Sequence, residues 1–298
     1  MFKWILVFIS IFTFSLFSEE IQDPISSKKN KIFIKRNDNL FTAMEEEVHR
    51  SLFRSYYNNG DEKVVNYQIG FLYNFLESDF SIEGRFQELR KGNYSNAQNV
   101  CSVSSRSCLF ITAPIGTYFR NEIVVNGMYD AYDQLIFVKV GTRFIRSELS
   151  DTNYVFSTDR FNQSSLGVNI GIKLLTPKFY NFYLSLDLET FYSQGTLKHE
   201  FSNTTPRGIN IGTYSKGSPH QKTWGQEITA MLNYDINQKF YIGIGFSQLR
   251  STIRPNEMII NTGNFNYDTR KNMELEILGG KSFSDSFFAS TVEFGVYF

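Results

Sequence analysis

Hydrophobic and polar residues alternate at every second position along most of the chain from residue 66 onward. In 164–175 the even positions from Leu166 to Leu174 are apolar, and the positions between them are small or polar. Strict alternation indicates β-strands with one apolar and one polar face. The same pattern occurs in 67–76, 79–90, 135–147, 181–197, 223–235, 239–250, 269–280 and 288–298. This repetition predicts an all-β protein.

The polar face of these strands collects Gly, Ser, Asn and charges of both signs, including Glu83 and Glu293. A soluble sandwich buries its apolar face, whereas a membrane barrel turns that face to lipid and keeps polar residues inside. We therefore expect an antiparallel transmembrane β-barrel of about 8–10 strands over residues 66–298, with a tenth strand within 107–126. The charges expected inside it are Arg85, Lys139, Arg143, Lys173, Asp187, Glu189, Glu227, Lys239, Glu274 and Glu276.

Connections of two lengths join the expected strands. Short turns are expected near 77–78, 176–180, 235–238 and 282–285, and long loops at about 91–130, 148–163, 198–222 and 253–268. With ten strands, these turns would put both chain ends on the side of the long loops, whereas outer-membrane barrels keep their ends in the periplasm. Either one strand is miscounted or some short connections lie outside.

The chain closes on the alternating run VEFGVYF, in which Phe294, Val296 and Phe298 occupy every second position. This run resembles the C-terminal signature of small bacterial outer-membrane β-barrel proteins, a terminal aromatic residue preceded by alternating apolar residues. The resemblance extends to the class only. It implies location in the bacterial outer membrane, contact with outer-membrane lipid, and insertion by the barrel-assembly machinery.

The first 65 residues follow another pattern. Lys3 and the apolar run Trp4–Phe17 predict a signal peptide over 1–18, with an uncleaved anchor as the alternative. Residues 19–65 are expected to form a linker, with a basic stretch at 28–36, and an amphipathic helix from Asn39 to about Tyr57. After residue 18 no apolar stretch is long enough for a membrane helix, so an exported chain would enter a membrane only as a barrel.

The charge balance limits the class of partner. The chain has 30 basic and 30 acidic residues, which argues against nucleic acid. Aromatic residues make up 16% of the chain although the mean hydropathy is −0.26, as suits strands with only one apolar face. We expect no cofactor and no metal site.

One segment carries candidate catalytic residues. The stretch HEFSNTTPRGIN (199–210) resembles the His-x-Ser-Asn segment of outer-membrane lipid A deacylases, in which His activates a Ser nucleophile. The resemblance implies Ser202 as the nucleophile and His199 as the base. The spacing here is one residue longer, which puts the two side chains on opposite faces of a strand unless a bulge intervenes.

The leading functional interpretation is a non-enzymatic outer-membrane barrel. Interior charges of both signs are expected to pair and fill the lumen, leaving structural, adhesive or ligand-binding roles to the surface-exposed loops. Two alternatives stay open: a porin or transport channel, which requires an unfilled lumen, and a lipid A deacylase-like hydrolase using His199 and Ser202.

Export to an oxidising compartment predicts a disulfide between the two cysteines, Cys101 and Cys108. Closing so short a loop would stabilise the fold by about 2.5 kcal/mol on the chain-entropy model. Peptide mapping under non-reducing conditions should recover the two cysteines in one linked species. Two free thiols in the folded protein would contradict the prediction.

Overall fold

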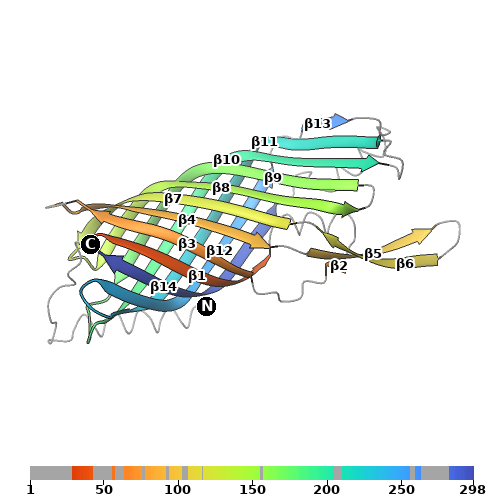
Figure 1. Cartoon of the computed structure of the whole chain (residues 1–298). Coiled ribbons are helices and arrows are strands. Elements are labelled where there is room, and N and C mark those ends of the chain that lie inside the picture. Colours follow the sequence, from red (N-terminus) through yellow and green to blue (C-terminus); the bar gives the residue numbers. More distant parts are fainter. Residues whose placement is uncertain are drawn as a thin grey trace.

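Ten strands of the protein form one closed antiparallel ring in a computed structural model (Figure 1). The structure describes residues 29–42, 56–57, 64–75, 78–91, 94–102, 107–115, 117–154, 157–204, 210–255, 259–262 and 282–298. Each strand of the ring is paired on both sides, and pairing of β10 with β11 closes it. The ten strands are β1 (Lys31–Thr42), β3 (Val64–Asn74), β4 (Phe80–Lys91), β7 (Thr117–Tyr132), β8 (Ile136–Tyr154), β9 (Ser157–Leu175), β10 (Phe182–Thr204), β11 (Asn210–Asp235), β12 (Phe240–Pro255) and β14 (Phe283–Tyr297). The expected all-β barrel is confirmed.

Four further strands lie outside the ring. The short strand β13 (Ile259–Thr262) pairs with the extended part of β11. A separate sheet contains β2 (Tyr56–Tyr57), β5 (Tyr94–Ser102) and β6 (Ser107–Ile115), and its register places Cys101 directly opposite Cys108. Within the described ranges, no helix is long and apolar enough to cross a membrane.

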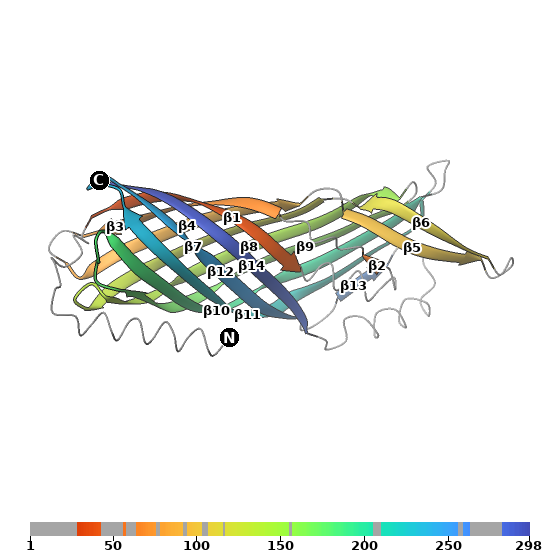
Figure 2. The same ribbon diagram turned by 90° about the horizontal axis from the view of Figure 1, so that it is seen from below.

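The two ends of the barrel differ in their connections. Short connections join β3 to β4, β7 to β8, β9 to β10 and β11 to β12, and the start of β1 and the C-terminal Phe298 lie beside them. The amide of Phe298 donates to the carbonyl of Asn30 (3.0 Å), and that of Tyr297 to Lys239 in the connection after β11 (2.8 Å). We call this the turn end and the opposite end the loop end; the strands tilt strongly between them (Figure 2).

This arrangement removes the conflict over the chain ends. The turn expected at 282–285 is wrong, because β14 already begins at Phe283. The structure also adds β1 to the ring, between β3 and β14. With those two changes, ten strands bring the start of β1 and the C-terminal Phe298 to the side of the short turns. The strand expected over 269–280 lies outside the described residues, and the ring closes without it.

The helix expected from Asn39 to Tyr57 is wrong where the structure describes that segment. Residues 39–42 end strand β1, Tyr56 and Tyr57 form β2, and the rest lies outside the described residues. The basic stretch 28–36 is likewise not a linker, because Lys31, Phe33 and Lys35 alternate with outward Ile32 and Ile34. The barrel therefore begins before residue 66.

Much of the segments expected as long loops is strand. Residues 117–130 belong to β7, while β8 and β9 run on to Tyr154 and from Ser157. In the same way β10 extends to Thr204 and β11 begins at Asn210. These extensions carry paired strands beyond the part of the barrel that has an apolar exterior.

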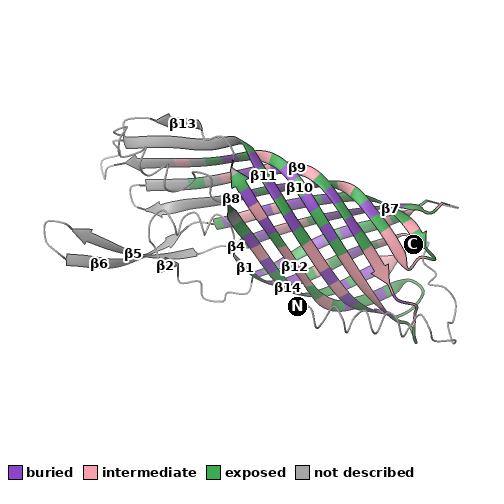
Figure 3. Ribbon diagram, turned by 180° about the vertical axis from the view of Figure 1, so that it is seen from behind, coloured by how far each residue is buried: buried purple, intermediate pink, exposed green. Residues whose placement is uncertain are grey.

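Side chains on the ring alternate between an apolar exterior and a polar lumen over most of its height (Figure 3). On β9, Leu166, Val168, Ile170 and Ile172 are 45–60% exposed, while Asn169 between them is fully buried. On β14, Phe294 and the terminal Phe298 also face outward and are exposed. The barrel is therefore apolar outside and polar inside.

This polarity reverses near the loop end. On β10, Leu188 is outward and Glu189 buried, whereas ten positions on, Lys198 is outward and Leu197 buried. Successive side chains continue to point alternately inward and outward along the strand. What changes is the type of residue found on each face. The same reversal occurs on two other strands, between Arg85–Phe86 and Leu89–Arg90 on β4 and between Arg143–Phe144 and Ile145–Arg146 on β8.

Several aromatic rings lie over a glycine directly opposite on the neighbouring strand. Tyr241 of β12 pairs with Gly295 of β14, and a Cβ built on Gly295 would lie 2.1 Å from the Tyr241 ring. Phe33 covers Gly70 in the same way. The missing side chain leaves the space that the ring fills, an arrangement that stabilises glycine in sheets.

Gly295→Ala should therefore destabilise the barrel by about 1–3 kcal/mol, because the Tyr241 ring has to move out of its site. The free energy of unfolding, from urea titration in lipid vesicles, measures the effect. Gly127→Ala is the matched control, since the nearest atom to a Cβ there is 3.6 Å away. Equal losses in both variants would contradict the steric explanation.

Candidate functional site

The lumen of the barrel is the candidate functional site, because charged side chains from several strands meet there. On β8, Lys139 and Arg143 are four positions apart, and on β10, Asp187 and Glu189 are two apart. Even spacing puts both members of each pair on the same face of their strand. That face is the interior, where Lys139 and Arg143 have no exposed surface.

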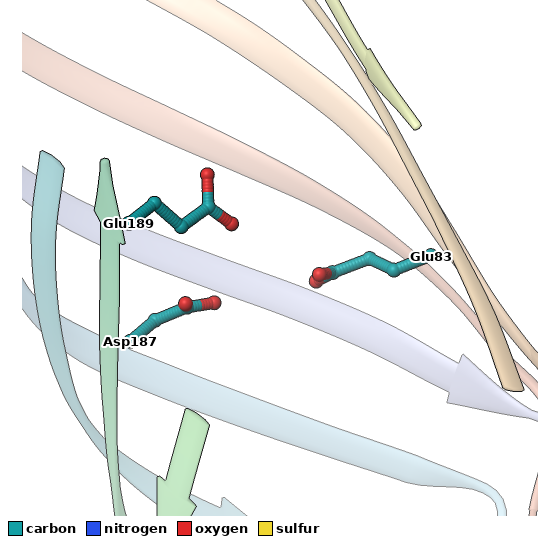
Figure 4. A group of neighbouring side chains, drawn as sticks. All are labelled: Glu83, Asp187 and Glu189. Carbon is teal, nitrogen blue, oxygen red and sulfur yellow. The ribbon is translucent and has the colours of Figure 1, made fainter. Parts of the chain in front are cut away.

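The ammonium group of Lys139 lies among three carboxylates. Its Nζ is 2.6 Å from Oε2 of Glu83, 2.8 Å from Oδ2 of Asp187 and 2.5 Å from Oε1 of Glu189. Glu83 comes from β4 and the other two from β10, and all three point toward one another (Figure 4). Their oxygens lie within 4.8 Å of one another, a spacing that suits a cation. In this protein the Lys139 ammonium takes the cation's place.

Two guanidinium groups lie beside this cluster. Nη2 of Arg143 donates to Glu189 (2.9 Å) and to Glu227. Arg85 also donates to Glu189, and its Nη1 is 3.4 Å from Oε1 of Glu227. The Arg143 guanidinium stacks 4.4 Å from the centre of the Phe191 ring. Charge-assisted bonds of this kind are roughly twice as strong as neutral ones.

Toward the loop end, large apolar side chains join charged and polar ones in the lumen. Arg120 pairs with Glu122 (3.2 Å) and with Asp285 of β14 (2.9 Å), and Arg143 reaches Glu122 from the other side (3.2 Å). At the same levels, Leu89 is opposite Arg120 and Ile145 is opposite Glu122. The large apolar side chains that fill this part of the interior have at most 6% of their surface exposed and lie among buried polar residues; they are Leu89, Tyr118, Ile145, Leu197, Ile253 and Phe287.

The turn end contains a cavity of about 400 Å³. Its lining includes Lys31 and Lys173, and also Glu293, whose carboxylate accepts from Tyr241 (2.5 Å) and pairs with Lys35 (3.1 Å). The volume is in the range of small-molecule sites. Glu83, Arg85 and Asp187 also line it, so the cavity reaches the charge cluster.

The structure brings together seven of the charges expected inside: Arg85, Lys139, Arg143, Lys173, Asp187, Glu189 and Glu227. Lys173 is the outlying member, with its Nζ 3.7 Å from Glu83. The prediction that Lys239 faces the interior is wrong, because this residue lies in the connection between β11 and β12 and is exposed. Glu274 and Glu276 lie outside the described residues.

Among the described residues, sequence reasoning missed six interior charges: Lys31, Lys35, Arg120, Glu122, Asp235 and Asp285. The first two alternate with Ile32 and Ile34, so the signal was present in a stretch whose charge suggested a linker. Arg120 and Glu122 lie two apart within the segment expected to hold a tenth strand. Asp285 was hidden because 282–285 was expected to be a turn.

The hydrolase alternative depends on a bulge between His199 and Ser202. Both lie on β10, where the register with β9 and with β11 is unbroken from Leu197 to Asn203. Residues three apart on a regular strand belong to opposite faces. The strand therefore does not supply the bulge that this alternative requires.

No protein-family model and no curated protein matches the chain. Among solved structures, it is similar to the outer membrane protease OmpT of Escherichia coli, with 11% identity, a TM-score of 0.45, and 94% of this chain and 100% of that chain covered. It is also similar to the toluene transporter TodX of Pseudomonas putida, with 7% identity, a TM-score of 0.37, and 95% and 91% covered. A FadL homologue of Pseudomonas aeruginosa gives 7% identity, a TM-score of 0.35, and 92% and 90% covered. With scores below 0.5, these similarities carry no argument, and the fold follows from the chain's own strand pairing.

Replacing Lys139 by Met should destabilise the protein by about 3–5 kcal/mol, because it leaves three buried carboxylates without their shared cation. Urea unfolding in lipid vesicles measures the loss. Lys239→Met, at an exposed position, is the matched control and should leave the unfolding midpoint unchanged. A Lys139→Met protein as stable as the control would show that the carboxylates do not depend on this ammonium.

Proposed function

We propose that this chain is an exported, integral protein of the bacterial outer membrane, with a sealed lumen and a non-enzymatic role at the cell surface. The observation that carries the proposal is the reversal of polarity along the strands. Where the lumen is charged, the exterior is apolar, as lipid requires. Nearer the loop end, where large apolar side chains enter the lumen, the exterior carries charged side chains such as Arg90 and Lys198.

The outer face near the loop end supports this division. Ion pairs occur there between outward side chains, such as Arg160–Glu148 at 3.3 Å and Lys198–Glu200 at 2.5 Å. Exposed ion pairs of this type are well solvated in water, whereas placing their charges in lipid costs free energy. These pairs support extended strands that project from the membrane, and we infer that the loop end lies outside the cell and the turn end in the periplasm.

The filled lumen supports a role other than conduction. The charge cluster and the large apolar side chains together fill the interior of the described barrel, so we expect recognition at the loop end. We propose that an extracellular ligand binds there, while the apolar exterior contacts outer-membrane lipid. Insertion would use the barrel-assembly machinery, after export directed by residues 1–18.

Thiol labelling along β10 tests the proposed boundary. Leu188 and Lys198 both face outward, one in the apolar part and one in the charged part. In a background of Cys101→Ser and Cys108→Ser, a membrane-impermeant maleimide should label Lys198→Cys on intact cells and leave Leu188→Cys unlabelled. Equal labelling, or recovery of the protein in the soluble periplasm, would overturn the proposal.

A transport channel is the second candidate, and the cavity at the turn end is the observation that favours it. The two candidates differ in conductance. The sealed barrel should give no steady current in planar bilayers, because the charges of the lumen are held by shared contacts. Large, stable single-channel steps from the unmutated protein would instead favour the channel.

A further inference from the structure

Two lysine side chains, Lys31 of β1 and Lys173 of β9, line the cavity at the turn end without a close anionic partner. We call them the cavity lysines. Nζ of Lys31 is 4.0 Å from the nearest oxygen of Glu293, and Nζ of Lys173 is 3.7 Å from that of Glu83. Both distances are too long for a hydrogen bond. Among the described residues neither ammonium group has a hydrogen-bond acceptor, although the two side chains are only 14% and 13% exposed.

The carboxylates nearest to the cavity lysines are already bound by closer donors. Glu293 pairs with Lys35 at 3.1 Å and accepts a hydrogen bond from the Tyr241 hydroxyl at 2.5 Å. Glu83 pairs with Lys139 at 2.6 Å. Neither carboxylate therefore depends on a cavity lysine, and the donors of both ammonium groups stay available to another acceptor.

The cavity lysines also repel each other. Of the charged groups around Lys31, Lys173 acts on it more strongly than any single carboxylate does. Inside a protein such repulsion is screened less than in water. The cavity lining as a whole has more basic than acidic side chains, six against four. An anion placed between the two ammonium groups would replace this repulsion by two attractions.

Apolar and aromatic side chains lie next to each of the two ammonium groups. Lys31 is opposite Leu72 of β3 and Tyr297 of β14 in the strand register. Lys173 is opposite Phe137 of β8. All three neighbours line the cavity. A concave site with apolar walls and a few polar groups is typical of small-molecule binding, so the lining suits an anion that carries an apolar body.

We propose that this cavity binds a small organic carboxylate, with the carboxylate between the cavity lysines and its apolar body against the neighbouring side chains. A carboxylate has two oxygens, so it can accept a hydrogen bond from each ammonium group. Lys178, Asn181 and Asn237 also line the cavity and belong to the short connections, so the site reaches the turn end. At its other side the charge cluster closes it, and the ligand binds without crossing the barrel.

This site is separate from the recognition proposed at the loop end. It depends on the proposed membrane location only for the compartment that supplies the ligand, which is the periplasm.

Binding to the barrel in lipid nanodiscs tests the site, with para-fluorobenzoate as the probe. Its control is para-fluorobenzamide, which has a similar shape and no charge. Fluorine NMR should show saturable broadening of the benzoate signal, beyond that caused by empty nanodiscs, and none for the benzamide. Inorganic phosphate, which has no apolar body, should displace the benzoate only weakly.

Lys31→Met and Lys173→Met should each weaken binding of the benzoate about tenfold or more, because each removes a charge-assisted hydrogen bond. Both variants should keep the urea unfolding midpoint of the unmutated protein, since Glu293 and Glu83 retain their closer partners. Lys239→Met, at an exposed position of the turn end outside the cavity lining, is the matched control and should bind the benzoate normally.

Absence of saturable benzoate binding to the unmutated protein would overturn the proposal without recourse to any variant. Equal binding of the benzamide, or equal affinity in the two cavity variants and the control, would show that the lysines do not hold the ligand. Phosphate that competes as well as the benzoate would refute the apolar part of the site. Thiol labelling along β10 tests the membrane location separately, so a correctly labelled barrel that fails to bind refutes the carboxylate site alone.

Discussion

The carboxylate of Glu189 accepts hydrogen bonds from side chains of four other strands of the ring. Arg85 of β4, Asn126 of β7, Lys139 and Arg143 of β8 and Asn169 of β9 all donate to it. Backbone ladders connect each strand only to its neighbours, whereas this group joins β10 to strands three and four places away. It therefore fixes the cross-section of the barrel as well as neutralising its own buried charge.

A second constraint acts from outside. Every backbone group in the middle of a closed ring is paired, so the backbone needs no hydrogen bonds from the surroundings. Only the side chains differ between the part in lipid and the part in water. The strands keep one alternation from end to end and exchange the chemistry of their two faces where the surroundings change, as Leu188 and Lys198 show on β10. Arg36 and Asp38 are the outward charges that do not follow this division.

Most of the strands could be predicted from the sequence because alternation depends only on local geometry. Strand β1 could not, since its inward positions include Lys31 and Lys35 and its outward positions include Arg36 and Asp38, so neither face is uniformly apolar. The identity of the interior charges followed from the strands that were recognised. Their partners did not follow, because alternation gives the face of a residue but not its position around the ring. Glu83 and Lys139 are on strands separated by β7, and only closure of the ring brings them together.

The charged and the apolar side chains that fill the lumen resist opening for different reasons. A solute entering the cavity from the turn end meets Glu83 and Asp187, whose contacts with Lys139 are shared with Glu189 and through it with Arg85 and Arg143. Because the contacts are shared, displacing one side chain leaves several buried charges without partners, and the cost rises faster than for isolated pairs. The buried apolar side chains nearer the loop end add a barrier to ions and polar solutes. Because Leu89 and Ile145 are opposite Arg120 and Glu122, the apolar and charged groups pack together, and conduction would require both to rearrange.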